Sequence, residues 1–145
     1  IRDRESEMKN EYWTSQVDIR RRGADAWVMF AQGRKDAAIA QMRETADMED
    51  LTDKSAVTPG PIAPARELLG YMLLENGQPK EALVEFEAVM KKEPNRFLGI
   101  YGAGKAAEGS KQTAKAKTFY KQLVEMCKDA GTERPELQYA RKMAN

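Results

Sequence analysis

Apolar residues recur every three or four positions over most of the chain, and this spacing predicts amphipathic helices. From Arg2 to Gly33 the pattern predicts one long helix or two, with Gly23 as the expected break. The glycine at position 33 ends this segment, and the same spacing returns between Ala37 and Ala46. We therefore expect an antiparallel helical pair in the first third of the chain.

The apolar periodicity stops after Asp50, where three closely spaced prolines, Pro59, Pro61 and Pro64, exclude a helix interior. Residues 51–62 are therefore expected to form a proline-rich loop. Such a long loop is either a plain connector or a functional insert that folds over a binding surface.

Helical spacing resumes after the loop and continues to the end of the chain. Proline at the start of a segment, and Asn-Gly or proline after it, mark the expected helix ends. The predicted helices cover residues 64–76, 79–93, 97–108, 113–127 and 135–144. Strand patterns are absent from the sequence, so the predicted fold class is all-α.

Comparison of the chain with itself reveals a period of 34 residues. A glycine, an alanine and an aromatic residue recur at this interval: Gly70, Ala82 and Phe86, then Gly104, Ala116 and Tyr120. A weaker copy precedes them at an offset of 44 residues: Gly33 aligns with Gly77, Ala38 with Ala82 and Met42 with Phe86. The larger offset is explained by the proline-rich loop.

This period, with Leu69-Gly70, Ala82, Phe86 and Pro94 at their mutual spacings, resembles the tetratricopeptide repeat (TPR). The resemblance implies an α-solenoid of antiparallel helix-turn-helix repeats. Gly70 and Ala82 would lie where two helices cross closely, and Phe86 would fill the gap to the next repeat. The second copy departs from the pattern, because Lys128 stands where the closing proline is expected.

The resemblance divides the single expected domain, 1–145, into parts. In chain order they are a helical extension (1–18), a divergent repeat (19–50), the loop (51–62), two repeats (63–96 and 97–130) and a capping helix (131–145). More narrowly, residues 57–70 resemble the C-terminal part of larger bacterial TPR proteins of uncharacterised function.

The amino-acid composition argues against several classes of function. The 24 basic and 23 acidic side chains leave a net charge of +1, which gives no support for nucleic-acid binding. Without histidine the chain lacks the usual base for a serine or cysteine nucleophile, and the single Cys127 excludes an internal disulfide. We expect neither enzymatic activity nor a cofactor or metal. No apolar run is long enough to span a membrane, so a cytoplasmic location is the default expectation.

In TPR proteins the first helices of successive repeats line a concave surface, so the expected partner is a protein or peptide. The corresponding positions in this sequence are Trp27, Phe30, Glu67, Tyr71, Leu74, Tyr101, Lys105 and Glu108. As an alternative, Trp27 and Phe30 pack beneath the long N-terminal helix, and the two tyrosines belong to the core.

The family's clamp for a terminal carboxylate uses Lys, Asn and Arg on the first helices. The corresponding positions here are Pro64, Leu68, Tyr71, Leu98, Gly102 and Lys105, so the clamp is essentially missing. Binding of chaperone C-terminal tails is therefore not expected.

Three other motifs are interpreted as structural or solvent-exposed features and not as binding sites. The glycines of residues 99–104 follow no strand, which excludes a phosphate-binding loop. The acidic residues of 47–53 lack calcium-loop spacing and are expected to be solvated, like the arginines of 20–22, which are expected in a turn. Cys127 is expected to be a buried, inert thiol.

Two further functions remain open. The chain could form a homo-oligomer in which the helix around Met8, Tyr12 and Ile19 pairs with a second copy. It could also be a regulatory or accessory segment of a larger protein, because the sequence does not begin with methionine.

Overall fold

The computed structural model describes the backbone of residues 2–52, 61–131 and 134–145, and side chains from residue 11 onward within those ranges. These residues form seven α-helices and no strand. The chain divides into two compact units, Ile1–Leu69 and Gly70–Asn145, which are described separately. Most of the predicted proline-rich loop, residues 53–60, lies outside the described residues.

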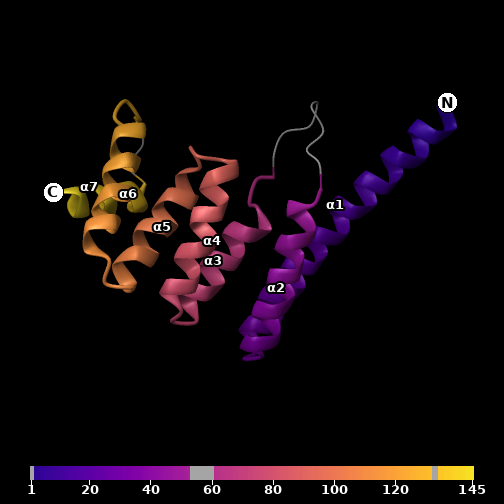
Figure 1. The fold of residues 1–145 in the computed structure, drawn as a ribbon, viewed down its shortest axis with the longest axis horizontal. Coiled ribbons are helices and arrows are strands. Elements are labelled where there is room, and N and C mark those ends of the chain that lie inside the picture. The colour runs from indigo at the N-terminus through magenta and orange to yellow at the C-terminus, as the bar shows by residue number, and fades with distance from the viewer. Residues whose placement is uncertain (1, 53–60, 132–133) are drawn as a thin grey trace. The chain divides into compact units, whose positions relative to one another are not determined.

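The first unit contains α1 (Arg2–Ala31), α2 (Lys35–Asp50) and the start of α3 (Ala65–Glu75). Helices α1 and α2 run antiparallel side by side (Figure 1). Their buried apolar side chains are all aliphatic: Ile19, Ala26, Ala38, Met42 and Ala46.

Helix α1 is continuous through Gly23, so the break expected at this glycine is absent. A glycine inside a helix costs only about 1 kcal/mol relative to alanine. Ile19 and Ala26, on either side of it, are both buried. Their burial offsets that cost.

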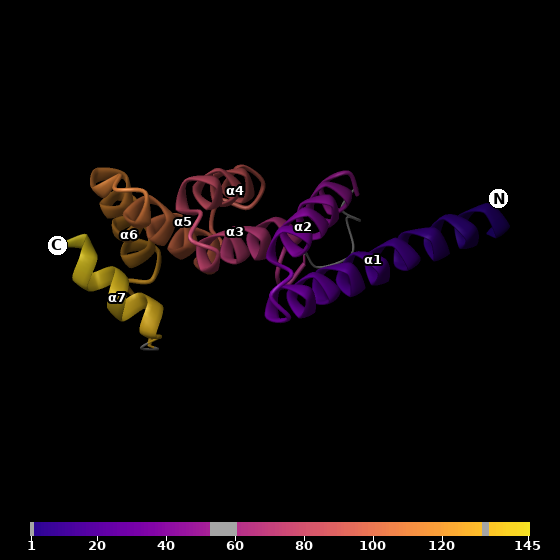
Figure 2. The same ribbon diagram turned by 90° about the horizontal axis from the view of Figure 1, so that it is seen from below.

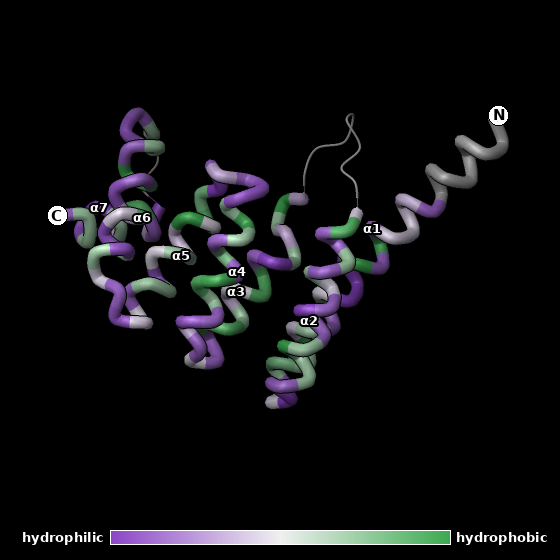
Figure 3. Tube along the Cα trace, in the orientation of Figure 1, coloured by the Kyte–Doolittle hydropathy of each residue, from purple (hydrophilic) through white to green (hydrophobic). Residues whose placement is uncertain are grey.

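The second unit contains the rest of α3, followed by α4 (Pro79–Lys92), α5 (Phe97–Gly109), α6 (Thr113–Met126) and α7 (Pro135–Ala144). From α4 onward, each helix packs against the next one in the chain (Figure 2). Hydrophilic and hydrophobic residues are interleaved along α4 (Figure 3), and its inward face buries Ala82, Leu83, Phe86 and Val89. The helix bounds agree with the predicted ones to within one or two residues.

Three inter-helix turns have the same hydrogen-bonding pattern. In each, a residue with positive φ ends the first helix: Gly33, Gly77 and Lys111. Its N–H bonds to the carbonyl three residues earlier, and the next N–H bonds to the carbonyl five residues before it. This pair of bonds defines the Schellman motif.

The aromatic ring of each repeat in the second unit packs directly on glycine. A Cβ at Gly70 would lie 2.7 Å from the Phe86 ring, and one at Gly102 would lie 2.4 Å from the same ring. A Cβ at Gly104 would lie 2.5 Å from Tyr120. Phe86 therefore fills the space between α3 and α5, as the repeat pattern predicts.

Candidate functional site

One face of α5 carries three polar side chains, Tyr101, Lys105 and Glu108, at spacings of four and three residues. Tyr120 from α6 and Tyr139 from α7 meet them. We call these five residues the tyrosine cluster. All of them belong to the second unit.

Glu108 is the hydrogen-bond acceptor at the centre of the tyrosine cluster. Its carboxylate accepts bonds from the hydroxyls of Tyr120 and Tyr139, each at 2.8 Å, and Lys105 Nζ lies 3.4 Å away. Burial alone would raise the pKa of Glu108, but the bonds from the two tyrosines and the charge of Lys105 outweigh it and lower that pKa. The carboxylate is therefore charged at neutral pH.

Lys105 is the cation of the cluster. Its Nζ lies 4.3 Å from the centroid of the Tyr139 ring and 3.1 Å from the hydroxyl of the same residue. Burial would lower the pKa of Lys105, yet the bond to Tyr139 and the charge of Glu108 raise it overall. The ammonium group is held in place and remains about one-third exposed.

The three tyrosine rings contact one another. Tyr139 makes edge-on contacts, with centroid distances of 6.2 Å to Tyr101 and 5.8 Å to Tyr120. Burial raises the pKa of both Tyr101 and Tyr120, so their hydroxyls stay protonated near neutral pH. Tyr120 is fully buried, whereas Tyr101 and Tyr139 are half-buried. The cluster thus has one buried ring, Tyr120, beneath two rings whose edges are partly exposed.

Tyr71 and Leu74 lie on α3 of the same unit. The Tyr71 ring packs edge-on against Phe86 at 5.0 Å, and its hydroxyl donates a 2.8 Å bond to the carbonyl of Leu98 on α5. Leu74, nearly one turn further along α3, is half-buried. Tyr71 therefore joins α3 to α5 and keeps only part of its surface exposed.

Comparison with solved structures identifies the fold. A TPR-like protein from Chlorobium tepidum TLS superposes with a TM-score of 0.62 at 18% identity, over 92% of this chain and 96% of that one. The fold is TPR-like. No protein-family model matches the sequence, and no curated protein matches it. A TPR-like fold is typical of protein-interaction scaffolds and is not usually catalytic.

The remaining predicted interaction residues lie in the first unit. Trp27 and Phe30 pack edge-on at 5.7 Å, and both are half-buried. They belong to α1 itself, so they do not lie beneath a separate N-terminal helix, because that helix continues through Gly23. Glu67 is only 1% exposed and offers almost no surface to a partner.

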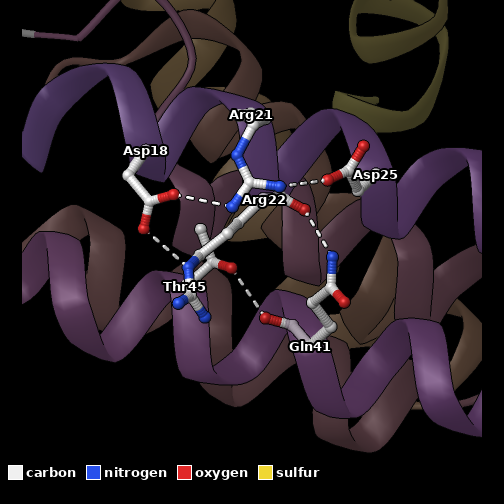
Figure 4. Close-up of polar contacts among 6 residues, drawn as sticks. All are labelled: Asp18, Arg21, Arg22, Asp25, Gln41 and Thr45. Atoms are coloured by element: carbon white, nitrogen blue, oxygen red, sulfur yellow. Dashed lines mark hydrogen bonds and ion pairs between the residues drawn. The ribbon is translucent and has the colours of Figure 1, made fainter. Parts of the chain in front are cut away.

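The arginines of residues 20–22 lie within α1 and not in a turn. Figure 4 shows Arg21 bridging Asp18 and Asp25, while Arg22 pairs with Asp18 at 2.7 Å. Gln41 of α2 donates a 2.9 Å bond to the carbonyl of Arg22 (Figure 4). The ion pairs lie within α1 and largely compensate these charges, whereas the bond from Gln41 joins α2 to α1.

The acidic residues at the end of α2 are also engaged. Asp47 and Asp50 pair with Arg66, and Glu49 accepts a bond from the N–H of Ala65. They hold the start of α3 to α2 instead of forming a purely solvated face; Asp53 lies outside the described residues. No group of three or more metal-ligating side chains occurs in the described part of the chain.

The sequence pattern missed Tyr139. The last helix was expected to act only as a cap, and its Leu137 and Ala140 are buried. Yet Tyr139 lies 34 residues after Lys105, so extending the repeat period into the last helix would have found the pair. Cys127 directly follows α6 and is half-buried, so the expectation of a buried thiol was wrong.

None of the described helices combines the length and the apolar character needed to cross a bilayer.

Proposed function

We propose that this protein is a scaffold that binds a protein or peptide segment, with the partly exposed side of the tyrosine cluster as its main contact. The observation that carries the proposal is that Tyr101, Lys105 and Tyr139 are half-buried and held in place: Glu108 binds Lys105 and Tyr139, and the Tyr101 ring packs against Tyr139. Rigid aromatic edges bind with little loss of side-chain entropy.

The chemistry of the cluster favours a particular kind of segment. Tyr101 and Tyr139 offer aromatic edges for an apolar side chain, and Lys105 offers a cation. An ammonium group has three N–H donors, whereas Lys105 meets two acceptors among the described residues, the oxygens of Tyr139 and Glu108. We therefore expect a segment with an apolar residue next to a carbonyl or carboxylate acceptor.

The proposed binding surface extends from the cluster to Tyr71 and Leu74, which are half-buried on α3. In the first unit, Trp27 and Phe30 remain proposed contacts, because both keep part of their rings exposed. We leave Glu67 out of the proposed surface because of its burial.

Affinity capture from the native lysate with identification by mass spectrometry tests this proposal. The bait variant is Tyr101→Ala with Lys105→Ala, and the matched control is Lys121→Ala, which removes an exposed lysine from α6. We expect the main partner to be lost only from the first variant. In titrations with the partner's binding segment, the affinity of this variant should be at least tenfold weaker, which corresponds to about 1.4 kcal/mol of binding free energy. Equal recovery by both variants would refute the cluster as the binding surface.

The contribution of Tyr71 to binding is tested with a substitution that keeps its ring. Tyr71→Ala would remove a ring that packs on Phe86, so lost binding could reflect unfolding. Tyr71→Phe removes only the bond to Leu98 and leaves the ring in place.

The wider setting of the scaffold is also a proposal. The likeness of residues 57–70 to the C-terminal part of larger bacterial TPR proteins suggests an accessory segment of a larger protein, and the cytoplasm is its default location. The length of the natural open reading frame and the location of the tagged protein in cells test these two points.

A further inference from the structure

Helix α1 has an apolar stripe on the face turned away from its buried residues. The stripe consists of exposed residues spaced at four, seven, four and three positions: Trp13, Val17, Ala24, Val28 and Ala31. Trp13 is 47% exposed, Val17 67% and Val28 55%. These intervals place all five side chains on one side of a helix. Ile19 and Ala26, which are buried, lie on the opposite side.

Four of the five stripe residues pair with one another when the stripe is read in the opposite direction, and Ala24 pairs with the exposed Arg20. Trp13 and Ala31 are equidistant from residue 22, and Val17 and Val28 have almost the same midpoint. In an antiparallel pair of α1 helices, Val17 would face Val28 of the second copy, and the large Trp13 would face the small Ala31. A two-fold symmetric pair of helices makes every such contact twice.

The charges beside the stripe fit the same arrangement. Arg21 and Asp25 flank the apolar residues, pair with each other within α1 at 2.9 Å, and have side chains that are 61% and 50% exposed. An antiparallel two-fold brings each flank of one helix to the same flank of the other. Asp25 would then lie level with Arg21 of the second copy, and the reverse pair would form by symmetry. Opposite charges at both places favour this alignment over a shifted one.

We propose that two copies of this protein associate through antiparallel pairing of their α1 helices along this stripe. The interface differs from the one that the sequence predicts, because Ile19 is 1% exposed, Tyr12 is half-buried and the side chain of Met8 lies outside the described residues. It is also separate from the tyrosine cluster, so each proposal can fail without the other.

The mass of the full-length protein in solution tests the pairing. Sedimentation equilibrium over the micromolar to millimolar range should show a monomer–dimer equilibrium. Val17→Asp with Val28→Asp should weaken association at least tenfold, because it places carboxylates opposite each other in the stripe. The control is Val84→Asp, because Val84 of α4 is 64% exposed but lies outside the stripe. It should leave the equilibrium unchanged, and circular dichroism should show that all variants stay helical.

Cysteine cross-linking tests the direction of pairing. In a Cys127→Ser background, one preparation carries Val17→Cys and another carries Val28→Cys. Antiparallel pairing predicts efficient oxidative cross-linking only when the two preparations are mixed. Parallel pairing predicts cross-links within the Val17→Cys preparation alone, and that result would overturn the proposal.

Two other outcomes would also overturn it. One is a monomeric mass at every concentration, including the case in which the monomer sediments with anionic vesicles and the stripe proves to be a membrane-binding face. The other is an equal loss of association in the Val84→Asp control.

Discussion

The two units fill the space between paired helices in different ways. In the second unit a ring packs on glycine, with Phe86 against Gly70 and Gly102, and Tyr120 against Gly104. At the corresponding positions of the first unit, 44 residues earlier than Gly70 and Phe86, stand Ala26 and Met42. Both are fully buried.

The difference determines how well the core of each unit tolerates a change of side-chain size. A ring that would lie within 2.4–2.9 Å of an added Cβ tolerates no larger neighbour. Methionine is flexible and fills irregular space, so its neighbours can vary more. The second unit should therefore react more strongly to a change in either partner of a ring–glycine pair.

The largest expected effect comes from Phe86→Ala. It empties the space between α3 and α5 and should lower the free energy of unfolding by about 3–5 kcal/mol. Met42→Ala in the first unit should cost less, about 2–3 kcal/mol, because that core can adjust around a smaller residue. Urea denaturation followed by circular dichroism measures both. An equal or larger loss for Met42→Ala would contradict the comparison.

Gly102→Ala comes next. The new methyl group would lie 2.4 Å from the Phe86 ring, and such overpacking should cost about 1–3 kcal/mol in the free energy of unfolding. The double variant Gly102→Ala with Phe86→Leu supplies the control. If steric conflict is the cause, the two losses will be less than additive in urea denaturation. Full additivity would rule out this cause.

A smaller effect is expected at Glu108, and it depends on pH. Because the folded-state pKa of Glu108 is lowered, its contribution to stability is complete above the unfolded-state pKa of about 4.3 and is lost as the pH falls through the folded value. Glu108→Gln should cost about 1 kcal/mol at pH 7, allowing for the partial exposure of the carboxylate. Urea midpoints at pH 7 and at acid pH should show the difference shrinking. A constant difference would exclude the carboxylate charge as its source.

The smallest change is a gain in the first unit. Among the described residues, no heavy atom outside the local helix lies within 4 Å of a Cβ built at Gly23, so Gly23→Ala should raise the free energy of unfolding by about 0.5–1 kcal/mol. Both tryptophans, Trp13 and Trp27, lie in α1, so their fluorescence reports on this unit during denaturation. The same substitution thus has opposite expected signs at Gly23 and Gly102. A loss at both sites would show that packing around α1 is tighter than its geometry indicates.

The helices were predictable because their end signals act locally. Pro79 starts α4 and Gly77 ends the turn before it, and neither effect depends on distant residues. The helix break predicted at Gly23 was wrong because a contact with distant residues outweighs the local signal there. Glycine weakens a helix locally, and only the burial of Ile19 and Ala26 shows that the helix continues.

The candidate site was predictable only in part. The resemblance to the first helices of TPR proteins placed Tyr101 and Lys105 on one helix face, because spacing within a helix follows from the sequence. The bonds that Glu108 accepts from Tyr120 and Tyr139 join three helices and depend on how those helices pack. The concave binding surface and the division into repeats at 19–50, 63–96 and 97–130 remain predictions.

The repeated turn has a consequence for how such a chain can grow or shrink. A chain lacking residues 78–111 would join Gly77 directly to Gln112, which occupies the same place in its turn as Gln78 does. In that shorter chain Gly70 would take the place of Gly104 opposite Tyr120. The excision keeps both the backbone turn and the fit of the side chains. A gene segment that encodes 34 residues can therefore be duplicated or lost without changes in the flanking repeats.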